Sequence, residues 1–225
     1  MDQRRNRGHA VVKAASRARN DVFVYMEGGG DSDALKVELR QGMATWLGKY
    51  PALRGKLPRV VACGGREQAF DQFKTALAQG KNALLLVDSE ACVDLSHQAL
   101  PEERWLPWSH LKQQAGWTQP DAAGQQDAHL MVVCMESWFL AEPQVLATFF
   151  GAGFRELQLP HAGIEQQAKE RVYQALKQAS KHSAKGEYGK GSHSFKLLGL
   201  LDPVKVAAAS PWAKRFLDEL VKRKS

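Results

Sequence analysis

Cysteine is scarce in this sequence, and long apolar runs are missing. The 225 residues include three cysteines, which lie far apart and form no C-x-x-C pair, so neither a disulfide framework nor a zinc site is expected. The apolar runs stay below the roughly 18 residues that a membrane-spanning helix needs. Residues 1–19 are basic but lack the apolar segment of a secretory signal. These absences predict a soluble protein of a reducing cytoplasm, with no membrane partner.

Acidic residues are few at both ends of the chain. Residues 1–20 carry six Lys or Arg against one acid, and residues 181–225 carry ten against four, whereas the intervening segment has a net charge of −4. An acidic body with two basic ends is typical of proteins that bind a polyanion, so we expect nucleic acid as a partner. Basic ends that only maintain solubility are the alternative.

Four short apolar segments are each followed closely by glycine or an acid. They cover residues 22–26, 59–63, 83–87 and 130–135. Because each is apolar throughout rather than alternating, the pattern predicts parallel strands covered on both faces. Amphipathic segments at residues 35–47 and 67–77 separate the first three, as in strand–helix–strand units. The expected fold class is α/β, a mostly parallel sheet of about four strands with helices on both faces.

The sequence predicts three regions along the chain. Residues 1–20 have no hydrophobic period and form a basic arm, and residues 21–150 form the α/β core. Residues 151–225 form a helical extension packed on that core, with a basic loop at residues 181–194. Further helices are expected over residues 137–150, 164–179, 195–201 and 210–222. His129 and the three tryptophans between residues 105 and 117 are expected to be core or strand-edge residues.

Three acids follow the first and third predicted strands. Glu27 comes directly after the first strand, and Asp88 and Glu90 come after the third. Ligands of parallel sheets bind outside the carboxyl ends of the strands, so these acids meet if the two strands are neighbours. Carboxylate oxygens suit Mg²⁺, and on an extended strand end Asp88 and Glu90 would face the same way. We therefore predict a site for Mg²⁺ or Mn²⁺; acids that cap helices or stay solvated are the alternative.

Two further charged side chains are candidates for the same predicted site. Glu136 follows the fourth predicted strand, where it is either another metal ligand or an acid that favours the start of the next helix. Arg66 follows two glycines at a predicted helix start, where it either contacts phosphate together with neighbouring amides or stays solvated.

The basic loop supplies the remaining candidates. Lys185 and Lys190 would neutralise a phosphate during catalysis, and His193 would bind phosphate or act as a general acid or base near neutral pH. A solvated loop without a role is the alternative. Glycines 28–30 would let a backbone approach phosphate closely, but no P-loop motif is present there.

The acidic motifs resemble the Toprim fold, which topoisomerases, bacterial primases and OLD-type nucleases share. In that fold a glutamate after the first strand and a D-x-D after a later strand carry the metal and the acid–base chemistry. Glu27 matches the glutamate, and Asp88 matches the first aspartate, whereas Glu90 replaces the second. The segments VYMEGGGDSDALK, VACGGREQAFDQF, LLLVDSE, HLMVVCMESWFLAEP and KGEYGKGSHSFKLL are similar to a Toprim-like bacterial family found beside predicted ATPases in defence neighbourhoods.

This resemblance implies a Mg²⁺-dependent nuclease that hydrolyses DNA or RNA. It further implies the effector of a bacterial anti-phage defence system that works with a partner ATPase. A non-catalytic module that binds nucleic acid or docks on an ATPase is the alternative. A topoisomerase needs a catalytic tyrosine on another domain and a primase needs further domains, so we expect neither from a chain of this length.

Overall fold

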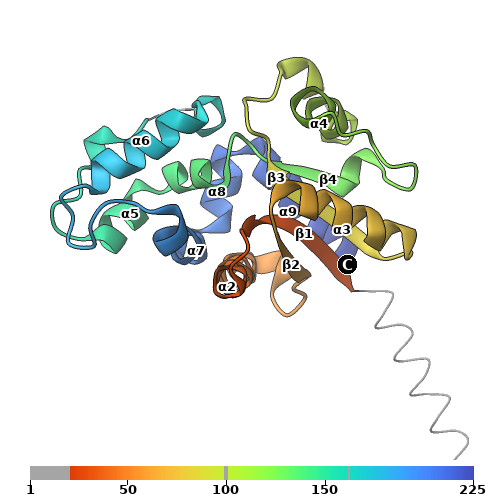
Figure 1. Ribbon diagram of the computed structural model, residues 1–225, viewed down its shortest axis with the longest axis horizontal. Coiled ribbons are helices and arrows are strands. Elements are labelled where there is room, and N and C mark those ends of the chain that lie inside the picture. The colour runs from red at the N-terminus through yellow and green to blue at the C-terminus, as the bar shows by residue number, and fades with distance from the viewer. Residues whose placement is uncertain (1–20, 99–100, 162) are drawn as a thin grey trace, which may run out of the picture.

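The computed structural model describes residues 21–98, 101–161 and 163–225; the predicted basic arm, residues 1–20, lies outside this range. Four parallel strands form one sheet in the order β2-β1-β3-β4. The strands are β1 (Val22–Gly29), β2 (Arg59–Gly64), β3 (Asn82–Asp88) and β4 (Ala128–Met131). Helices surround this sheet (Figure 1), so the predicted α/β class is confirmed, and the arrangement agrees with a Toprim-like α/β fold.

The central strands are buried because their side chains are apolar on both faces. Six of the seven residues of β3 are buried, and β1 pairs with β3 from Val22 opposite Asn82 to Met26 opposite Leu86. The fourth strand differs from its prediction, residues 130–135. It begins at Ala128 and ends at Met131, because Val133 has a φ of 64° and leaves the extended conformation.

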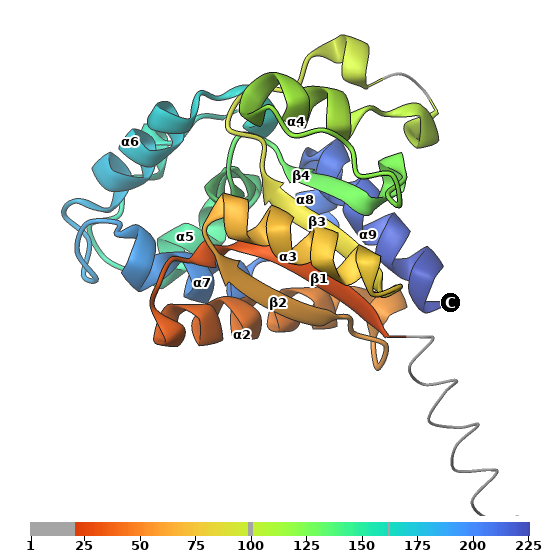
Figure 2. The same ribbon diagram turned by 45° about the vertical axis from the view of Figure 1, so that its right-hand side comes forward.

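Helices cover both faces of the sheet because successive crossovers run in opposite directions. The chain passes from β1 to β2 through α2 (Asp33–Lys49) and from β2 across β1 to β3 through α3 (Arg66–Ala78). Right-handed crossovers in opposite directions place the two helices on opposite faces. Figure 2 shows α3 in front of the strands and α9 (Pro211–Lys224) behind them. The Ser32 side chain accepts a hydrogen bond from the Leu35 amide and caps α2.

The residues after β4 are mainly helical, as predicted, but their boundaries differ. The expected helix over 137–150 is a 3₁₀ segment, Met135–Ala141, followed by α5 (Pro143–Phe150), because Pro143 favours a new helix start. The helix expected at 164–179 is α6 (Lys169–Ser180), preceded by a short 3₁₀ turn. The predicted loop is shorter, because α7 (Lys190–Leu200) begins within it. Helix α8 (Pro203–Ala209) was not expected.

The C-terminal helices pack on the sheet and on its helices. Helix α7 lies against α2 so closely that a side chain at Gly42 would collide with the carbonyl oxygen of Phe195. Helix α9 packs on β4, where Arg215 Nη1 donates to the carbonyl oxygen of Ala128 at 2.9 Å. Figure 1 shows α5, α6 and α7 gathered beyond the carboxyl ends of the strands. This arrangement brings residues from the C-terminal third to the edge where the acids lie.

The predicted core residues are buried. His129 is fully buried, and the three tryptophans at residues 105, 108 and 117 are each at most 5% exposed. A helix N-terminal to β4, α4 (Pro107–Ala115), carries Trp108, whose indole nitrogen donates to the Gly124 carbonyl oxygen at 2.9 Å. Among the residues with described coordinates, no helix combines the length and apolarity needed to cross a membrane.

Candidate metal centre

Glu27, Asp88 and Glu90 lie together at the carboxyl edge of the sheet. One side-chain oxygen from each lies within 4.8 Å of the others. Glu27 lies near the end of β1, and Asp88 ends β3, the strand paired with β1. The sheet continues to β2 on one side of this pair and to β4 on the other. Parallel sheets bind ligands at the carboxyl ends of such neighbouring strands, where the chain connections leave in opposite directions. The predicted neighbourhood of the three acids is therefore present.

Asp88 is the most buried of the three acids and is held in place by backbone contacts. Its side chain is 3% exposed, and Oδ1 accepts a hydrogen bond from the Met135 amide at 2.9 Å. Its own amide donates to Glu27 Oε2 at 3.3 Å. Burial raises the pKa of Asp88 well above its usual range, and the charges of Glu27 and Glu136 raise it further. Holding this group ionised therefore costs free energy that a nearby cation would offset.

The pKa of Glu27 is raised for the same reasons as that of Asp88. Burial raises its pKa, the charge of Glu90 adds to that effect, and Arg66, Lys169 and Lys190 oppose it. Hard divalent cations take oxygen ligands, and a cluster of mutually repelling carboxylates supplies such ligands. The three carboxylates at this edge are therefore a donor set that suits a hard divalent cation.

Glu90 reaches the cluster by a different route from the one predicted. It does not continue the extended strand: its φ is 67°, a left-handed conformation that is uncommon outside glycine. The Glu90 amide donates to the Val133 carbonyl oxygen at 3.0 Å, and the Val133 amide donates to Ser89 Oγ at 2.7 Å. Val133 also has a positive φ, 64°. These contacts hold two strained residues side by side, a pattern that is frequent at functional sites.

Lys169, the first residue of α6, was not among the predicted site residues. Its Nζ lies 2.8 and 2.7 Å from the two carboxylate oxygens of Glu90 and 3.5 Å from Asp88 Oδ2. Burial lowers the pKa of Lys169, but the charges of Asp88 and Glu90 outweigh burial and leave it raised. Nothing in the polar segment QQAKERV marks this lysine, because its role depends on where α6 docks.

We expect Lys169→Met to lower the stability of the metal-free protein and to raise its affinity for a metal ion. The substitution removes the cation that neutralises Glu90 and part of Asp88, so the carboxylates repel one another more strongly. Mn²⁺ affinity should rise by about tenfold, which corresponds to about 1.4 kcal/mol. The measurements are Mn²⁺ titration by electron paramagnetic resonance and thermal unfolding in EDTA. Lys177→Met, an exposed change in the last turn of the same helix, is the control; equal Mn²⁺ affinity in both variants would contradict the expectation.

Glu136 lies in the first turn of the 3₁₀ segment, as one of the two alternatives places it, but its side chain makes contacts that neither alternative includes. It is fully buried, and hydroxyl groups surround its carboxylate. Tyr188 Oη and Ser194 Oγ lie 2.9 and 3.2 Å from Oε1, and Tyr173 Oη lies 3.1 Å from Oε2. Burial raises the pKa of both tyrosines and the charge of Glu136 raises it further, so both remain donors. Glu136 thus joins the 3₁₀ segment to α6 and α7 instead of joining the group of three acids.

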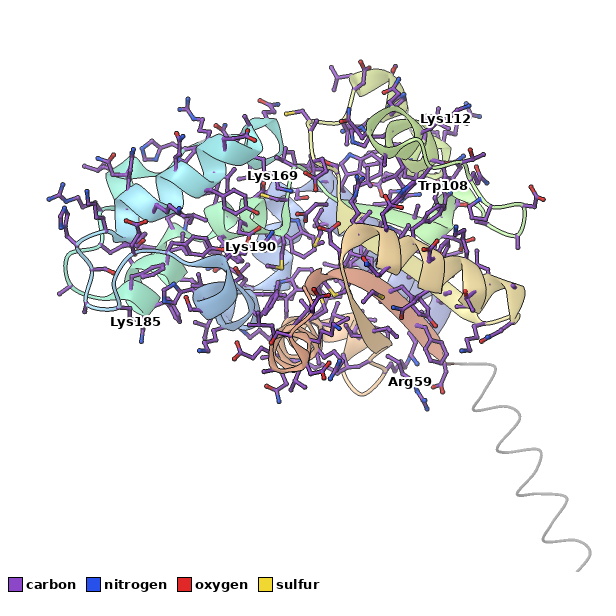
Figure 3. All side chains as sticks on the ribbon, viewed as in Figure 1. Arg59, Trp108, Lys112, Lys169, Lys185 and Lys190 are labelled. Carbon is purple, nitrogen blue, oxygen red and sulfur yellow. The ribbon has the colours of Figure 1, made fainter. Side chains whose placement is uncertain are left out.

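This hydroxyl network extends to one predicted lysine. Lys190 Nζ donates to Tyr173 Oη at 3.0 Å, so a chain of contacts runs from Glu136 through Tyr173 to Lys190. Figure 3 shows Lys190 and Lys169 pointing into the central region between the sheet and the C-terminal helices. Lys190 is therefore brought to the site, as predicted.

Lys185 and His193 lie against aromatic side chains, and their predicted roles at a phosphate stay predictions. Figure 3 shows Lys185 away from Lys169 and Lys190, and its Nζ lies 5.0 Å from the ring centre of Phe149. The His193 Nδ1 accepts a hydrogen bond from the Gly189 amide at 3.0 Å, and its ring packs on three aromatic rings. These contacts stabilise the start of α7.

Arg66 lies beside the cluster, at the first residue of α3. Its Nε is 3.8 Å from Glu27 Oε2, and its guanidinium carbon is 4.7 Å from the ring centre of Trp117. The Trp117 indole nitrogen donates to both oxygens of Glu67, at 3.0 and 3.1 Å. Buried Nε and Nη2 of Arg66 make no hydrogen bond to any residue in the described part of the chain. Arg66 is thus placed beside the cluster, and its predicted contact with phosphate stays a prediction.

A cavity of about 470 Å³ opens next to the acids. Its charged wall comes from Glu27, Asp31, Asp88, Glu136 and Lys190. The remaining wall comes from the β1–α2 connection, the first turn of α7 and apolar side chains of the core. The carboxylates, the lysine and the cavity together form one concave site.

Residues 26–221 match a family described as "Domain of unknown function (DUF4276)". The matched region includes the three acids, Lys169 and Lys190. No curated protein and no solved structure matches the chain.

Proposed function

The chain belongs to the DUF4276 family, whose description names no activity, and from the site we propose that this protein is a Mg²⁺-dependent nuclease. It would hydrolyse phosphodiester bonds of DNA or RNA. The observation that carries the proposal is the group of three carboxylates on neighbouring parallel strands, within 4.8 Å of one another and beside a cavity. The Toprim-like arrangement of strands, with acids after β1 and β3, supports the same chemistry.

Each charged residue has a separable role in this proposal. Glu27, Asp88 and Glu90 would hold Mg²⁺ or Mn²⁺, which when bound would polarise the phosphodiester and offset the charge that develops on it. Lys190, which lines the same cavity, would neutralise the phosphate, and Arg66 would reach it beside Glu27. Glu27 also suits proton transfer, because its raised pKa is closer to neutrality than that of an ordinary glutamate.

The proposed cellular role rests on resemblance. Similarity to the Toprim-like bacterial family found beside predicted ATPases supports an effector of anti-phage defence that works with a partner ATPase. The basic residues of the C-terminal region support nucleic acid as the substrate.

The test is cleavage of labelled plasmid, single-stranded DNA and tRNA by the purified chain. We expect cutting with Mg²⁺ or Mn²⁺ and no cutting in EDTA, with activity restored when the ion is added back. Thermal unfolding should show the same ion dependence, because a ligand that binds the folded state raises its stability. Absence of cutting and of any Mn²⁺-induced rise in the melting temperature, with or without the partner ATPase, would refute the proposal.

One observation favours a second function, a non-catalytic module that binds nucleic acid or docks on an ATPase. Lys169 already neutralises Glu90 and contacts Asp88, so the carboxylates have a partner within the chain itself. On this alternative, nucleic acid binds equally well in EDTA, and binding survives Asp88→Asn.

A further inference from the structure

The cavity beside the carboxylates has two chemically different walls. Its charged wall carries four carboxylates and one cation, from Glu27, Asp31, Asp88, Glu136 and Lys190. Its apolar wall is formed by Leu35 of α2, Met131 at the end of β4, Met135 of the 3₁₀ segment and Phe195 of α7. A ligand that fits this lining therefore combines an anionic part, beside the ion that the carboxylates would hold, with a flat or apolar part.

The volume of the cavity limits the size of that ligand. About 470 Å³ lies within the range of roughly 300–1,000 Å³ that encloses small molecules. A double helix is far too wide to enter a space of this volume. One nucleotide combines an anionic phosphate, a polar sugar and a flat base with two apolar faces, and this combination matches the mixed charged and apolar lining of the cavity.

We propose that this cavity binds a single unpaired nucleotide of the substrate, so that the protein acts on single-stranded nucleic acid. The inference rests on the proposed nuclease function and specifies its substrate class. The phosphate would lie between the carboxylates and Lys190, and the base would lie against Phe195 and the two methionines. Bases in a duplex must leave the stack before they enter such a pocket, which costs a few kcal/mol, and unpaired bases avoid that cost.

Glycines shape the cavity, and they differ in how much change they tolerate. Gly28 and Gly29 have φ values of 131° and 87°, and a Cβ on either would lie within 3 Å of a neighbouring side chain. Substitution there would disturb the fold. Gly191 differs: it lies in the first turn of α7, and a Cβ there would meet only Leu35 Cδ1, at the ordinary contact distance of 3.7 Å. The cavity can thus be narrowed from Gly191 without strain in the backbone.

The test compares Gly191→Ala and Gly191→Leu with Ser192→Leu. Ser192 is the exposed neighbour in the same turn of α7, so its substitution places the same leucine side chain outside the residues that line the cavity. The probes are a fluorescein-labelled mixed-sequence DNA strand and its duplex, with binding measured in Ca²⁺ and cleavage in Mg²⁺ or Mn²⁺. Mn²⁺ affinity is measured separately by electron paramagnetic resonance, and folding is checked by thermal unfolding.

We expect the wild type to prefer the single strand over the blunt duplex by about tenfold or more. Gly191→Leu should weaken single-strand binding by about tenfold, Gly191→Ala by less, and Ser192→Leu not at all, while all three keep wild-type Mn²⁺ affinity. Equal cleavage of single strand and duplex, or wild-type binding by Gly191→Leu, would overturn the inference and leave the nuclease proposal standing. If the wild type itself neither binds Mn²⁺ nor cleaves the single strand, the proposed function is refuted instead.

Discussion

Asp88→Asn is expected to abolish cleavage and, in the same protein, to raise the melting temperature measured in EDTA. The first effect follows from the position of Asp88 at the end of β3, within 4.8 Å of the oxygens of Glu27 and Glu90. Removing one charge from this group weakens ion binding, and with it the stabilisation of charge in the transition state. We expect cleavage to fall by about 1,000-fold, the upper end of losses seen when one such stabilising group is removed.

The second effect follows from the direction of the pKa shifts. Burial and the neighbouring acids raise the pKa of Asp88 in the folded state. An acid whose pKa is raised on folding makes its full contribution to the free energy of unfolding below the unfolded-state pKa of about 4. This contribution is lost as the pH rises through the folded-state pKa. At neutral pH, well above the unfolded-state value, this aspartate therefore lowers the stability of the metal-free fold. An asparagine keeps the acceptor for the Met135 amide and removes that charge.

The measurement is thermal unfolding of wild type and Asp88→Asn in EDTA across a series of pH values. We expect the variant to melt a few degrees higher at pH 7.5 and the difference to shrink toward zero near pH 4. Added Mn²⁺ should stabilise the wild type and leave the variant nearly unchanged. Asp71→Asn, an exposed change on α3, is the control. A variant that melts lower than the wild type at neutral pH would contradict the argument.

The opposite signs of these two effects make the prediction specific. An aspartate kept only for folding would lower stability when it is replaced. A catalytic group held in an unfavourable environment lowers activity and raises stability when it is replaced, a trade-off that is frequent at active sites. Because the two readouts are independent, a misfolded variant cannot imitate the expected result.

The main features of the sheet could be predicted because they depend on local pattern. Continuous apolar runs predicted three of the strands closely, and the acids after the first and third runs predicted the group at the sheet edge. The pairing of β1 with β3 then required only that β2 and β3 lie on opposite sides of β1 in the sheet. The fourth strand was misplaced because an apolar run continues through Val133 after the strand has ended.

The remaining site residues depend on tertiary contacts that no local pattern encodes. Lys169 reaches Glu90 only because α6 docks above the carboxyl edge of the sheet, 79 residues further along the chain. Glu90 turns toward the cluster through a left-handed conformation that two long-range contacts hold. Lys185 and Lys190 looked equivalent in the sequence, and the start of α7 at Lys190 separates them. The spacing of charges along a loop does not determine which of them faces the site.

Glu136→Leu is expected to cause the largest loss of stability among the substitutions considered. The carboxylate is fully buried and accepts hydrogen bonds from Tyr173, Tyr188 and Ser194. Hydrogen bonds to a charged group contribute about 1.5–3 kcal/mol each. Loss of Glu136 also removes one charge that repels Asp88, which offsets part of this cost. Tyr188 and Ser194 can still bond to each other, at 2.6 Å, whereas the Tyr173 hydroxyl loses its acceptor.

We therefore expect a net loss of about 2–4 kcal/mol, which lowers the melting temperature of a chain of this size by about 5–15 °C. Glu136→Gln, which keeps one acceptor oxygen, should lose less. The measurement is thermal unfolding in EDTA and in Mn²⁺. If Glu136 were instead a metal ligand, its loss would abolish the Mn²⁺-induced stabilisation; as a positioning residue, it should leave that stabilisation largely intact.

The same network predicts a kinetic effect that a structural role alone would not produce. Tyr173→Phe removes the hydroxyl that receives Lys190 Nζ and leaves Glu136 bonded to Tyr188 and Ser194. Stability should fall by about 1 kcal/mol, whereas kcat should fall by about tenfold, because Lys190 is then no longer oriented toward the phosphate. A kcat unchanged from wild type, with Mn²⁺ affinity preserved, would show that the network stabilises the docking of α6 and α7 and has no part in positioning Lys190.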